Sequence, residues 1–144
     1  MSSSIELVAT TKTLESTKNK QSPQRLLLIE TEHYLSNTFA ESTNESFYNT
    51  IKAPLDERLG QWLKSQLSVN QPNMIVIDIG ISTNDEVPLI SNIRALFDGL
   101  IFVVSGKNSE QEHINVLKNG ADDYLHKPMD KRILMLRIEG LFRR

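Results

Sequence analysis

The fold of this chain is indicated most clearly by the stretch Met74-Ile75-Val76-Ile77-Asp78, in which four consecutive apolar residues are followed by a single carboxylate. Two further runs have the same character, residues 25–30 (RLLLIE) and residues 100–105 (LIFVVS). Uninterrupted runs rich in Leu and β-branched residues are expected where helices cover both faces of a parallel sheet. The sequence therefore predicts three buried parallel strands, of which Met74–Asp78 is the third in chain order if a weaker strand precedes it.

Weaker strand candidates and helical segments lie between these runs. The strand candidates are Phe47–Ile51 and Tyr124–His126. One helical stripe consists of Leu55, Leu59, Trp62, Leu63 and Leu67, and other helices are expected at His33–Phe39, Val87–Phe97, Gln111–Asn119 and Lys131–Phe142. Gly120 follows Asn119, the last residue of an expected helix, at the position where a glycine C-cap is common. Five strands alternating with five helices predict an α/β fold with an open, doubly wound sheet.

The composition is that of one ordinary domain. The chain has 144 residues, of which 39% are hydrophobic and 24% charged, and its net charge of −2 gives no general attraction to nucleic acid or an anionic membrane. It has no cysteine, which excludes disulfides, thiol catalysis and thiolate metal sites. No apolar run approaches the length of a membrane span, and the first residues lack the basic-then-apolar pattern of a secretory signal. We therefore expect a cytoplasmic protein with no membrane partner.

The first 24 residues differ from the rest of the chain. They are rich in Ser, Thr, Lys and Gln, and we expect a mostly disordered leader there. Residues 25–144 then form the folded domain.

Polar residues end the predicted strands. Glu30 ends the first, Asp78 the third and Ser105 the fourth, and Lys127 follows the fifth. In an open α/β sheet, ligands bind beyond the carboxyl ends of the strands, where the strand order reverses. These four residues are thus expected to converge on one pocket. The alternative is that each only caps the solvated end of a strand.

The four residues suit phosphoryl transfer. An aspartate such as Asp78 can attack a phosphoryl group and hold it as an acyl phosphate. Lys127 and the Ser105 hydroxyl would supply the charge neutralisation and positioning that this reaction needs. Glu30 and Asp78 are hard oxygen ligands of the kind that suits Mg²⁺.

One segment carries a family resemblance. Residues 120–128 (GADDYLHKP), followed by Arg137-Ile138 and Arg143-Arg144, closely resemble the end of an OmpR/PhoB-type receiver domain of a two-component response regulator. The resemblance extends over residues 25–144. It implies the flavodoxin-like receiver fold, a five-stranded parallel sheet in the order 2-1-3-4-5 flanked by five helices.

The resemblance also implies roles for single residues. Asp78 matches the aspartate that accepts a phosphoryl group from a sensor histidine kinase. Ser105 matches the hydroxyl residue that moves toward that group, with Gly106 as the small residue beside it. Lys127 matches the phosphate-binding lysine, whose bond to the following proline is cis in this family. Tyr124 matches the aromatic switch that turns inward on activation.

The acidic pocket departs from the family pattern. The family has two adjacent acidic residues after the first strand, whereas this chain has Glu30 followed by Thr31, with Glu32 one place too late. Neighbouring side chains of an extended strand point to opposite sides, so Glu32 cannot simply replace position 31. The Gly80 backbone carbonyl would be a further ligand. We expect weaker Mg²⁺ binding, and slower phosphorylation or dephosphorylation.

In this subfamily, activation produces a homodimer through the fourth helix, fifth strand and fifth helix. Asp122, Asp123 and Arg137 match charged residues of that surface, and His113 and Ile133 replace two other charges. In the last helix, we expect Leu134, Ile138 and Leu141 to face the core, which leaves Ile133 and Met135 available to a partner. A dimer more apolar than usual is the resulting hypothesis.

The resemblance implies a signalling domain that at most catalyses its own phosphorylation and dephosphorylation. A DNA-binding output would belong to a further domain of a longer parent protein. One alternative is a pseudo-receiver that acts as a dimerisation or protein-interaction module without phosphorylation. A flavodoxin-like cofactor protein is disfavoured because the loop after the first strand is acidic, which repels phosphate. A hydrolase is disfavoured because His33, His113 and His126 lack the spacing of a metal site or a triad.

Overall fold

The sheet has the predicted strand order. The computed structural model describes residues 24–30, 32–40, 48–53, 59–79 and 86–144. Within these ranges, five strands pair in parallel in the order β2-β1-β3-β4-β5. Their bounds are β1 Gln24–Ile29, β2 Tyr48–Ala53, β3 Met74–Asp78, β4 Leu100–Ser105 and β5 Asp123–His126. The prediction of an α/β receiver fold is confirmed.

The strand boundaries differ slightly from the predicted ones. Gln24 begins β1 instead of ending the leader, and β2 continues to Ala53, because these residues pair along the whole length of the two strands. The expected leader, apart from Gln24, lies outside the described residues, as do Phe47 and Leu55.

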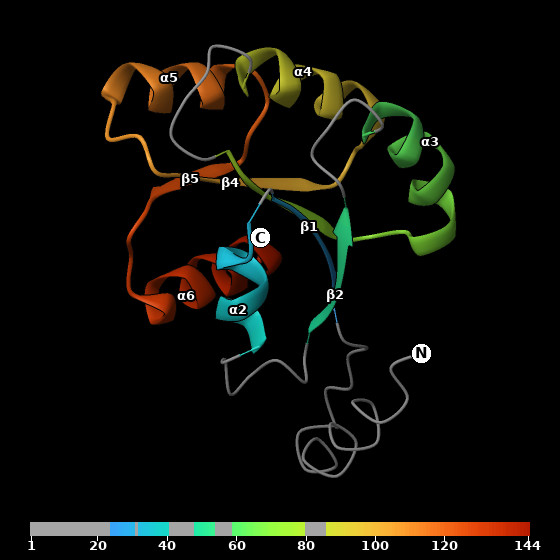
Figure 1. Ribbon diagram of the computed structural model, residues 1–144, viewed down its shortest axis with the longest axis horizontal. Coiled ribbons are helices and arrows are strands. Elements are labelled where there is room, and N and C mark those ends of the chain that lie inside the picture. The colour runs from blue at the N-terminus through green and yellow to red at the C-terminus, as the bar shows by residue number, and fades with distance from the viewer. Residues whose placement is uncertain (1–23, 31, 41–47, 54–58, 80–85) are drawn as a thin grey trace, which may run out of the picture.

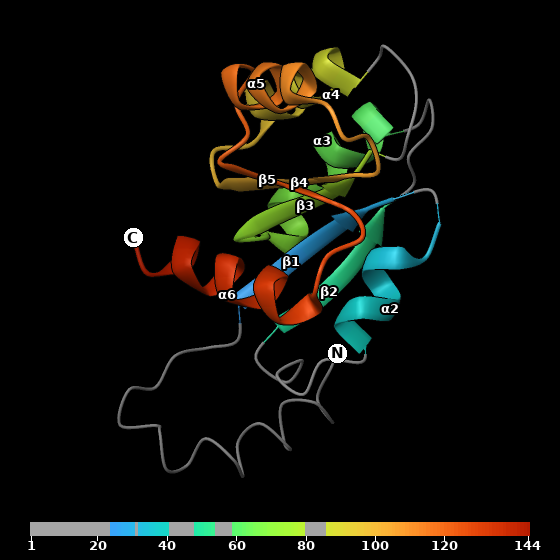
Figure 2. The ribbon, with the colours of Figure 1, turned by 90° about the vertical axis from the view of Figure 1, so that its left-hand side faces the viewer.

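Two layers of helices cover the sheet. The described helices are α2 Tyr34–Ala40, α3 Leu59–Asn70, α4 Glu86–Leu96, α5 Glu110–Lys118 and α6 Lys131–Phe142. Helices α3, α4 and α5 lie on one face, and α2 and α6 lie on the other (Figure 1). The view from the side shows the strands between these two layers (Figure 2). Within the described ranges, no helix has both the length and the apolar character needed to cross a membrane.

The alternation of side chains along each strand divides the core in two. In β3, Ile75 and Ile77 belong to the cluster beneath α3, α4 and α5, whereas Met74 and Val76 belong to the cluster shared with α2 and α6. Every residue of β3 is buried. This burial on both faces explains why the strand reads as one uninterrupted apolar run.

The last helix corrects one prediction. Met135 was expected to be available to a partner, but it is only 6% exposed and packs in the core shared with α2. The reason is that α6 buries a broad face, in which Met135 lies next to the expected core residue Leu134. Leu136 is the exposed residue instead, at 63%, together with the predicted Ile133 at 48%.

Gly120 provides a test of the turn between α5 and β5. Its φ is +123°, and a Cβ there would lie 2.7 Å from side-chain carbons of Arg94, which donates a hydrogen bond to the Gly120 carbonyl. We expect Gly120→Ala to lower the free energy of unfolding by about 1–2 kcal/mol, because L residues are strained at positive φ. Urea denaturation followed by circular dichroism measures this change.

Gly60→Ala is the matched control. Gly60 is exposed on α3, and a Cβ there would meet no atom within 4 Å. Alanine is the better helix former, so this variant should be as stable as the parent or slightly more stable. Equal stability of Gly120→Ala and the parent would contradict the strained turn.

Candidate functional site

A buried ion pair marks the carboxyl end of β3. Asp78 is 5% exposed, and the Lys127 ammonium donates to its Oδ1 at 2.9 Å and its Oδ2 at 2.8 Å. The Lys127 side chain is 18% exposed, and its Nζ also lies 4.9 Å from the centre of the Tyr34 ring. The Lys127–Pro128 peptide bond is cis, as expected. A carboxylate this deeply buried requires such a partner, because an unpaired charge in the interior is costly.

Ser105 lies beside this ion pair on the neighbouring strand. Asp78 pairs with Val104, so Ser105 stands one position beyond the partner of Asp78. Its carbonyl accepts a hydrogen bond from the Lys127 N–H at 2.7 Å, which ties the segment carrying the lysine to the end of β4. The register of parallel strands thus places Asp78, the backbone of Ser105 and Lys127 at the same edge of the sheet.

Glu30 has a role that the sequence did not reveal. It is 3% exposed, and its carboxylate accepts hydrogen bonds from Leu35 N at 2.8 Å, Ser36 N at 3.1 Å and Ser36 Oγ at 2.8 Å. Glu30 therefore satisfies amides in the first turn of α2, where a negative charge is favoured by the helix dipole. Glu30 directly follows β1 and has the same parity as Leu28, which packs in the core beneath α2.

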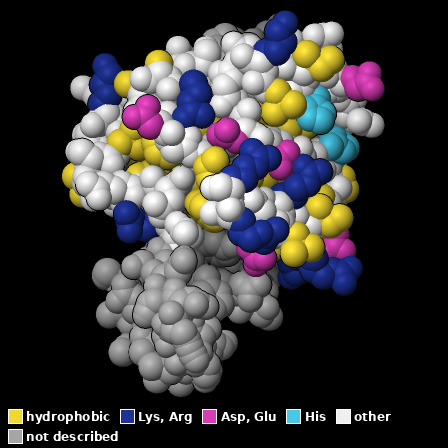
Figure 3. Space-filling model, turned by 180° about the vertical axis from the view of Figure 1, so that it is seen from behind, with side chains coloured by type: hydrophobic (Ala, Val, Ile, Leu, Met, Phe, Trp, Pro, Cys, Tyr) yellow, Lys and Arg dark blue, Asp and Glu magenta, His cyan; other side chains and the backbone are white. Residues whose placement is uncertain are grey.

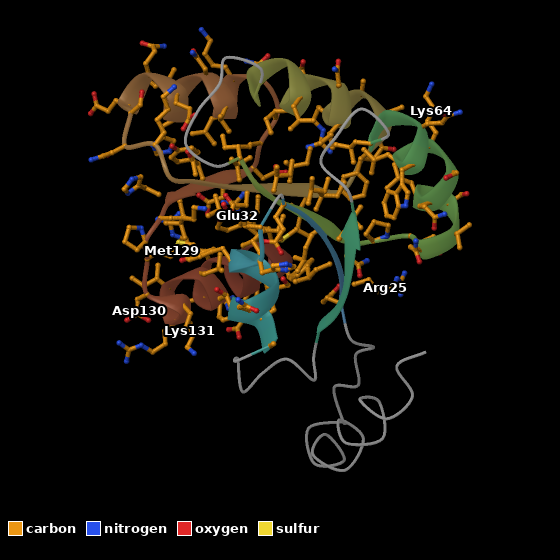
Figure 4. The ribbon with its side chains drawn as sticks, viewed as in Figure 1. Arg25, Glu32, Lys64, Met129, Asp130 and Lys131 are labelled. Carbon is orange, nitrogen blue, oxygen red and sulfur yellow. The ribbon has the colours of Figure 1, made fainter. Side chains whose placement is uncertain are left out.

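The described residues supply few metal ligands. They contain no group of three or more His, Cys, Asp or Glu side chains that could together hold a metal ion. Asp78 supplies one buried carboxylate, whereas Glu30 is engaged by α2, and Glu32 is exposed at the carboxyl end of β1 (Figure 4). The two other proposed ligand positions, Thr31 and Gly80, lie outside the described residues. One carboxylate with water and phosphate oxygens fits a weakly held Mg²⁺.

The segment after β5 holds Lys127 in place at the end of the sheet. Asp130 caps α6 by accepting from the Arg132 N–H at 2.8 Å, and its position at the start of the helix is visible in Figure 4. Hydrogen bonds from Arg132 hold the pKa of Asp130 at about 2. The cap fixes where α6 begins, four residues after Lys127 in the chain.

Tyr124 points into the molecule. It is 5% exposed, and its hydroxyl lies 2.7 Å from Glu112 Oε1 and 3.1 Å from the Lys107 carbonyl oxygen. The ring of His113 stacks on it with centroids 4.4 Å apart and planes at 19°. Ser105 Oγ donates to the same Glu112 oxygen at 2.8 Å. The predicted switch residues Ser105 and Tyr124 are thus joined through one carboxylate.

Sequence reasoning missed Glu112. The available signal was Ser109-x-x-Glu112, the pattern of a capping box. Ser109 does cap α5, with its Oγ accepting from the Glu112 N–H at 3.1 Å. A capping box would send the glutamate back to the Ser109 N–H, but that N–H donates to the Lys107 carbonyl. The local pattern therefore indicated a cap and gave no sign of the longer-range contact.

The charged residues predicted for a dimer surface have partners within the chain. Asp122 accepts from the Ile101 N–H at 2.9 Å and lies 3.5 Å from Arg94 Nη1. Asp123 accepts from Arg137 Nη1 at 2.7 Å, between β5 and α6. These pairs therefore help to fix the β5 edge in a single copy of the chain.

Comparison with known proteins decides the family. A model of the response regulator receiver domain matches residues 26–139. This chain belongs to that family. Receiver domains of this kind are signalling domains of two-component regulators that control transcription.

Similar proteins include OmpR/PhoB-type regulators. The transcriptional regulatory protein KdpE of Staphylococcus aureus is 33% identical over 119 residues, which cover 83% of this chain and 50% of that protein. PrrA of Mycobacterium tuberculosis is 36% identical over 76 residues, or 52% of this chain and 33% of that protein. A response regulator from Thermotoga maritima superposes with a TM-score of 0.71 at 21% identity, covering 86% of this receiver chain and 100% of the other. The chain spans about half the length of KdpE.

The Tyr124 hydroxyl gives a pH-dependent prediction. Burial and, next, the hydrogen bond to Glu112 raise the pKa of Tyr124 from 10.0 to about 12. A spectrophotometric titration of tyrosinate should therefore show one step near pH 12 that is missing in Tyr124→Phe.

The same shift predicts how stability changes with pH. Because the folded state holds the Tyr124 proton more tightly than the unfolded state, the stabilisation is complete below about pH 10. It is lost as pH rises toward about 12. Denaturation at several alkaline pH values should show a shallower loss in Tyr124→Phe, and identical slopes would contradict the buried hydroxyl.

Proposed function

We propose that Asp78 accepts a phosphoryl group from a sensor histidine kinase in the cytoplasm. The observation that carries this proposal is the buried Asp78 carboxylate with the Lys127 ammonium on both of its oxygens, at the edge of the sheet where doubly wound folds bind ligands. The family match and the similarity to KdpE, a transcriptional regulatory protein, support it. The signal would control DNA binding by a further domain of a longer protein.

The reaction is a displacement at phosphorus. One Asp78 oxygen forms the new bond to phosphorus while the bond between phosphorus and the donor breaks, and that electron pair leaves with the donor. Lys127 balances the charge of the incoming phosphoryl group, and the Ser105 hydroxyl supplies a hydrogen bond to one of its oxygens. Asp78, Glu30 and the Gly80 carbonyl would hold Mg²⁺, which would neutralise further charge when bound. Thr31, and not a second acidic residue, directly follows Glu30, so we propose that the ion is held weakly.

Intact-mass measurement after incubation with acetyl phosphate and Mg²⁺ tests the acceptor. The wild type should gain the mass of one phosphoryl group, and Asp78→Asn should gain none because the amide cannot form the acyl phosphate. Asp98→Asn, which changes an exposed aspartate, is the matched control and should label like the wild type. Omission of Mg²⁺ should slow the labelling.

The outcome also separates the receiver from the pseudo-receiver. Labelling of Asp78→Asn to the wild-type extent would place the phosphoryl group elsewhere. An unlabelled wild type that is already a dimer would favour a phosphorylation-independent interaction module. Two observations favour this alternative. Thr31 occupies the position where the family has its second acidic residue, and Glu30 accepts hydrogen bonds from α2.

We also propose that phosphorylation favours a homodimer through α5, β5 and α6. Four large apolar side chains are exposed on the two helices: Ile114 at 49% and Leu117 at 40% on α5, and Ile133 at 48% and Leu136 at 63% on α6. Figure 3 shows hydrophobic side chains along this edge of the molecule, interrupted by histidine and charged residues. Exposed apolar groups gathered at one edge are typical of an interaction surface.

Leu136→Glu tests the dimer surface. On a sizing column, the phosphorylated wild type should elute as a dimer, and Leu136→Glu should shift it toward monomer because a charge would be buried against the partner. Val69→Glu makes a matched change at a residue that is 72% exposed on α3, and it should leave the dimer intact. Moderate salt should have little effect, since ions screen charged contacts more than apolar ones. Loss of the wild-type dimer in salt would contradict an apolar interface.

A further inference from the structure

One carboxylate oxygen links the two residues that match the family switch. Glu112 Oε1 lies 2.8 Å from Ser105 Oγ and 2.7 Å from the Tyr124 hydroxyl. Ser105 is completely buried and Tyr124 is 5% exposed, so both hydroxyls are held away from solvent. We call this arrangement the Ser105–Glu112–Tyr124 bridge. It spans two neighbouring strands and the helix that covers them.

The sheet register explains why the bridge can form. Val103 pairs with Tyr124, and Ser105 has the same parity as Val103 along β4. Val103 and Tyr124 both pack in the core beneath α3, α4 and α5. The Ser105 and Tyr124 side chains therefore point to the face on which the first turn of α5 presents Glu112.

The turn before α5 also contacts the hydroxyl groups of Ser105 and Tyr124. The Lys107 N–H donates to Ser105 Oγ at 3.0 Å, and the Lys107 carbonyl lies 3.1 Å from the Tyr124 hydroxyl. That carbonyl also accepts from the Ser109 N–H at 3.1 Å. The bridge thus includes contacts with the loop that connects β4 to α5. A movement of the Ser105 side chain would therefore change hydrogen bonds at both ends of this loop.

Two acceptors would compete for the single hydroxyl proton of Ser105. A serine hydroxyl has one proton to donate, and Ser105 Oγ lies 2.8 Å from the Glu112 carboxylate and also hydrogen-bonds the Tyr124 side chain. A phosphoryl group on Asp78 would present negatively charged oxygens one strand away, and it would need the same proton. Ser105 cannot serve both acceptors at once. Donation of the Ser105 proton to the acyl phosphate would therefore break its link to Glu112.

We propose that Glu112 is a positioning residue that competes with the phosphoryl group for the Ser105 hydroxyl and couples the result to Tyr124. The inference rests on the proposed function, since it assumes that Asp78 is the acceptor. Loss of the Ser105 contact would leave the hydrogen bond between Glu112 and Tyr124, next to the stacked ring of His113. Phosphorylation of Asp78 would thereby change the contacts that Glu112 on α5 makes with Tyr124 on β5, and both elements belong to the proposed dimer surface.

Binding of beryllofluoride, a stable mimic of the acyl phosphate, tests the competition. The full chain would be titrated with beryllofluoride in Mg²⁺ and followed by amide NMR. Glu112→Gln should bind it roughly 3- to 10-fold more tightly, because a neutral acceptor holds the Ser105 proton less strongly than a carboxylate does. Glu110→Gln removes the same charge from an exposed position in the same helical turn and should bind like the wild type.

Two further variants separate a hydrogen bond from a general charge effect. Glu112→Asp keeps the charge but has too short a side chain to reach both hydroxyls, so it should also bind beryllofluoride more tightly. In a Ser105→Ala background, Glu112→Gln should have no further effect, because the proton for which it competes is absent. A charge effect would instead leave Glu112→Asp unchanged and would persist in Ser105→Ala.

The possible failures are distinguishable. If the wild type binds beryllofluoride and accepts a phosphoryl group but Glu112→Gln binds no more tightly, the positioning role of Glu112 is overturned and the proposed function stands. If the wild type does neither, the proposed function fails and the inference fails with it. Urea denaturation of each variant shows whether a changed affinity arises from loss of the fold.

Discussion

The ion pair between Asp78 and Lys127 is the interaction around which the rest of the molecule is arranged. Asp78 ends a strand that is buried on both faces, so its carboxylate cannot rely on water for solvation. Removal of one partner from a buried pair typically costs about 3–5 kcal/mol, because the other charge is left uncompensated. Lys127 can reach Asp78 only if β3, β4 and β5 pair in this order and the turn after β5 is held in place. The ion pair thus depends on the fold, and it places an ammonium group where an anionic group could bind.

The acidic residues around this pair have separate tasks. Asp78 faces the lysine, Glu30 satisfies the first turn of α2, and Glu112 binds the hydroxyls of Ser105 and Tyr124. Two of these carboxylates thus act on helices and switch residues, which leaves little negative charge to hold a cation. A site of this composition would rely on its ammonium more than on Mg²⁺ to balance a phosphoryl group.

The edge formed by α5, β5 and α6 combines internal ion pairs with exposed apolar groups. Asp123 and Arg137 join β5 to α6, and Asp122 and Arg94 join the start of β5 to α4. Surface ion pairs contribute little to association when their charges are already paired within one chain. The exposed apolar side chains of α5 and α6 are then the groups with most to gain from a partner.

The sequence by itself determined the strands, their order by family resemblance, and the residues at their carboxyl ends. The strands and the residues that end them are local features: an uninterrupted apolar run indicates a strand covered on both faces, and the residue that ends it must lie at the edge of the sheet. Asp78, Ser105 and Lys127 could be named in this way, and so could the inward-facing aromatic residue Tyr124.

Only the tertiary structure decided what the longer side chains contact. Glu30 accepts hydrogen bonds from the first turn of α2, a contact that its position after the first strand did not indicate, and Met135 was expected at the surface and instead lies in the core. Glu112 had a pattern that indicated a helix cap, yet it binds two hydroxyls from neighbouring strands. These outcomes depend on how each helix is placed against the sheet, because a rotation of one residue position changes which side chain meets the strand ends. Periodicity predicts that a helix packs on the sheet, but the packing itself selects the residues that touch the site.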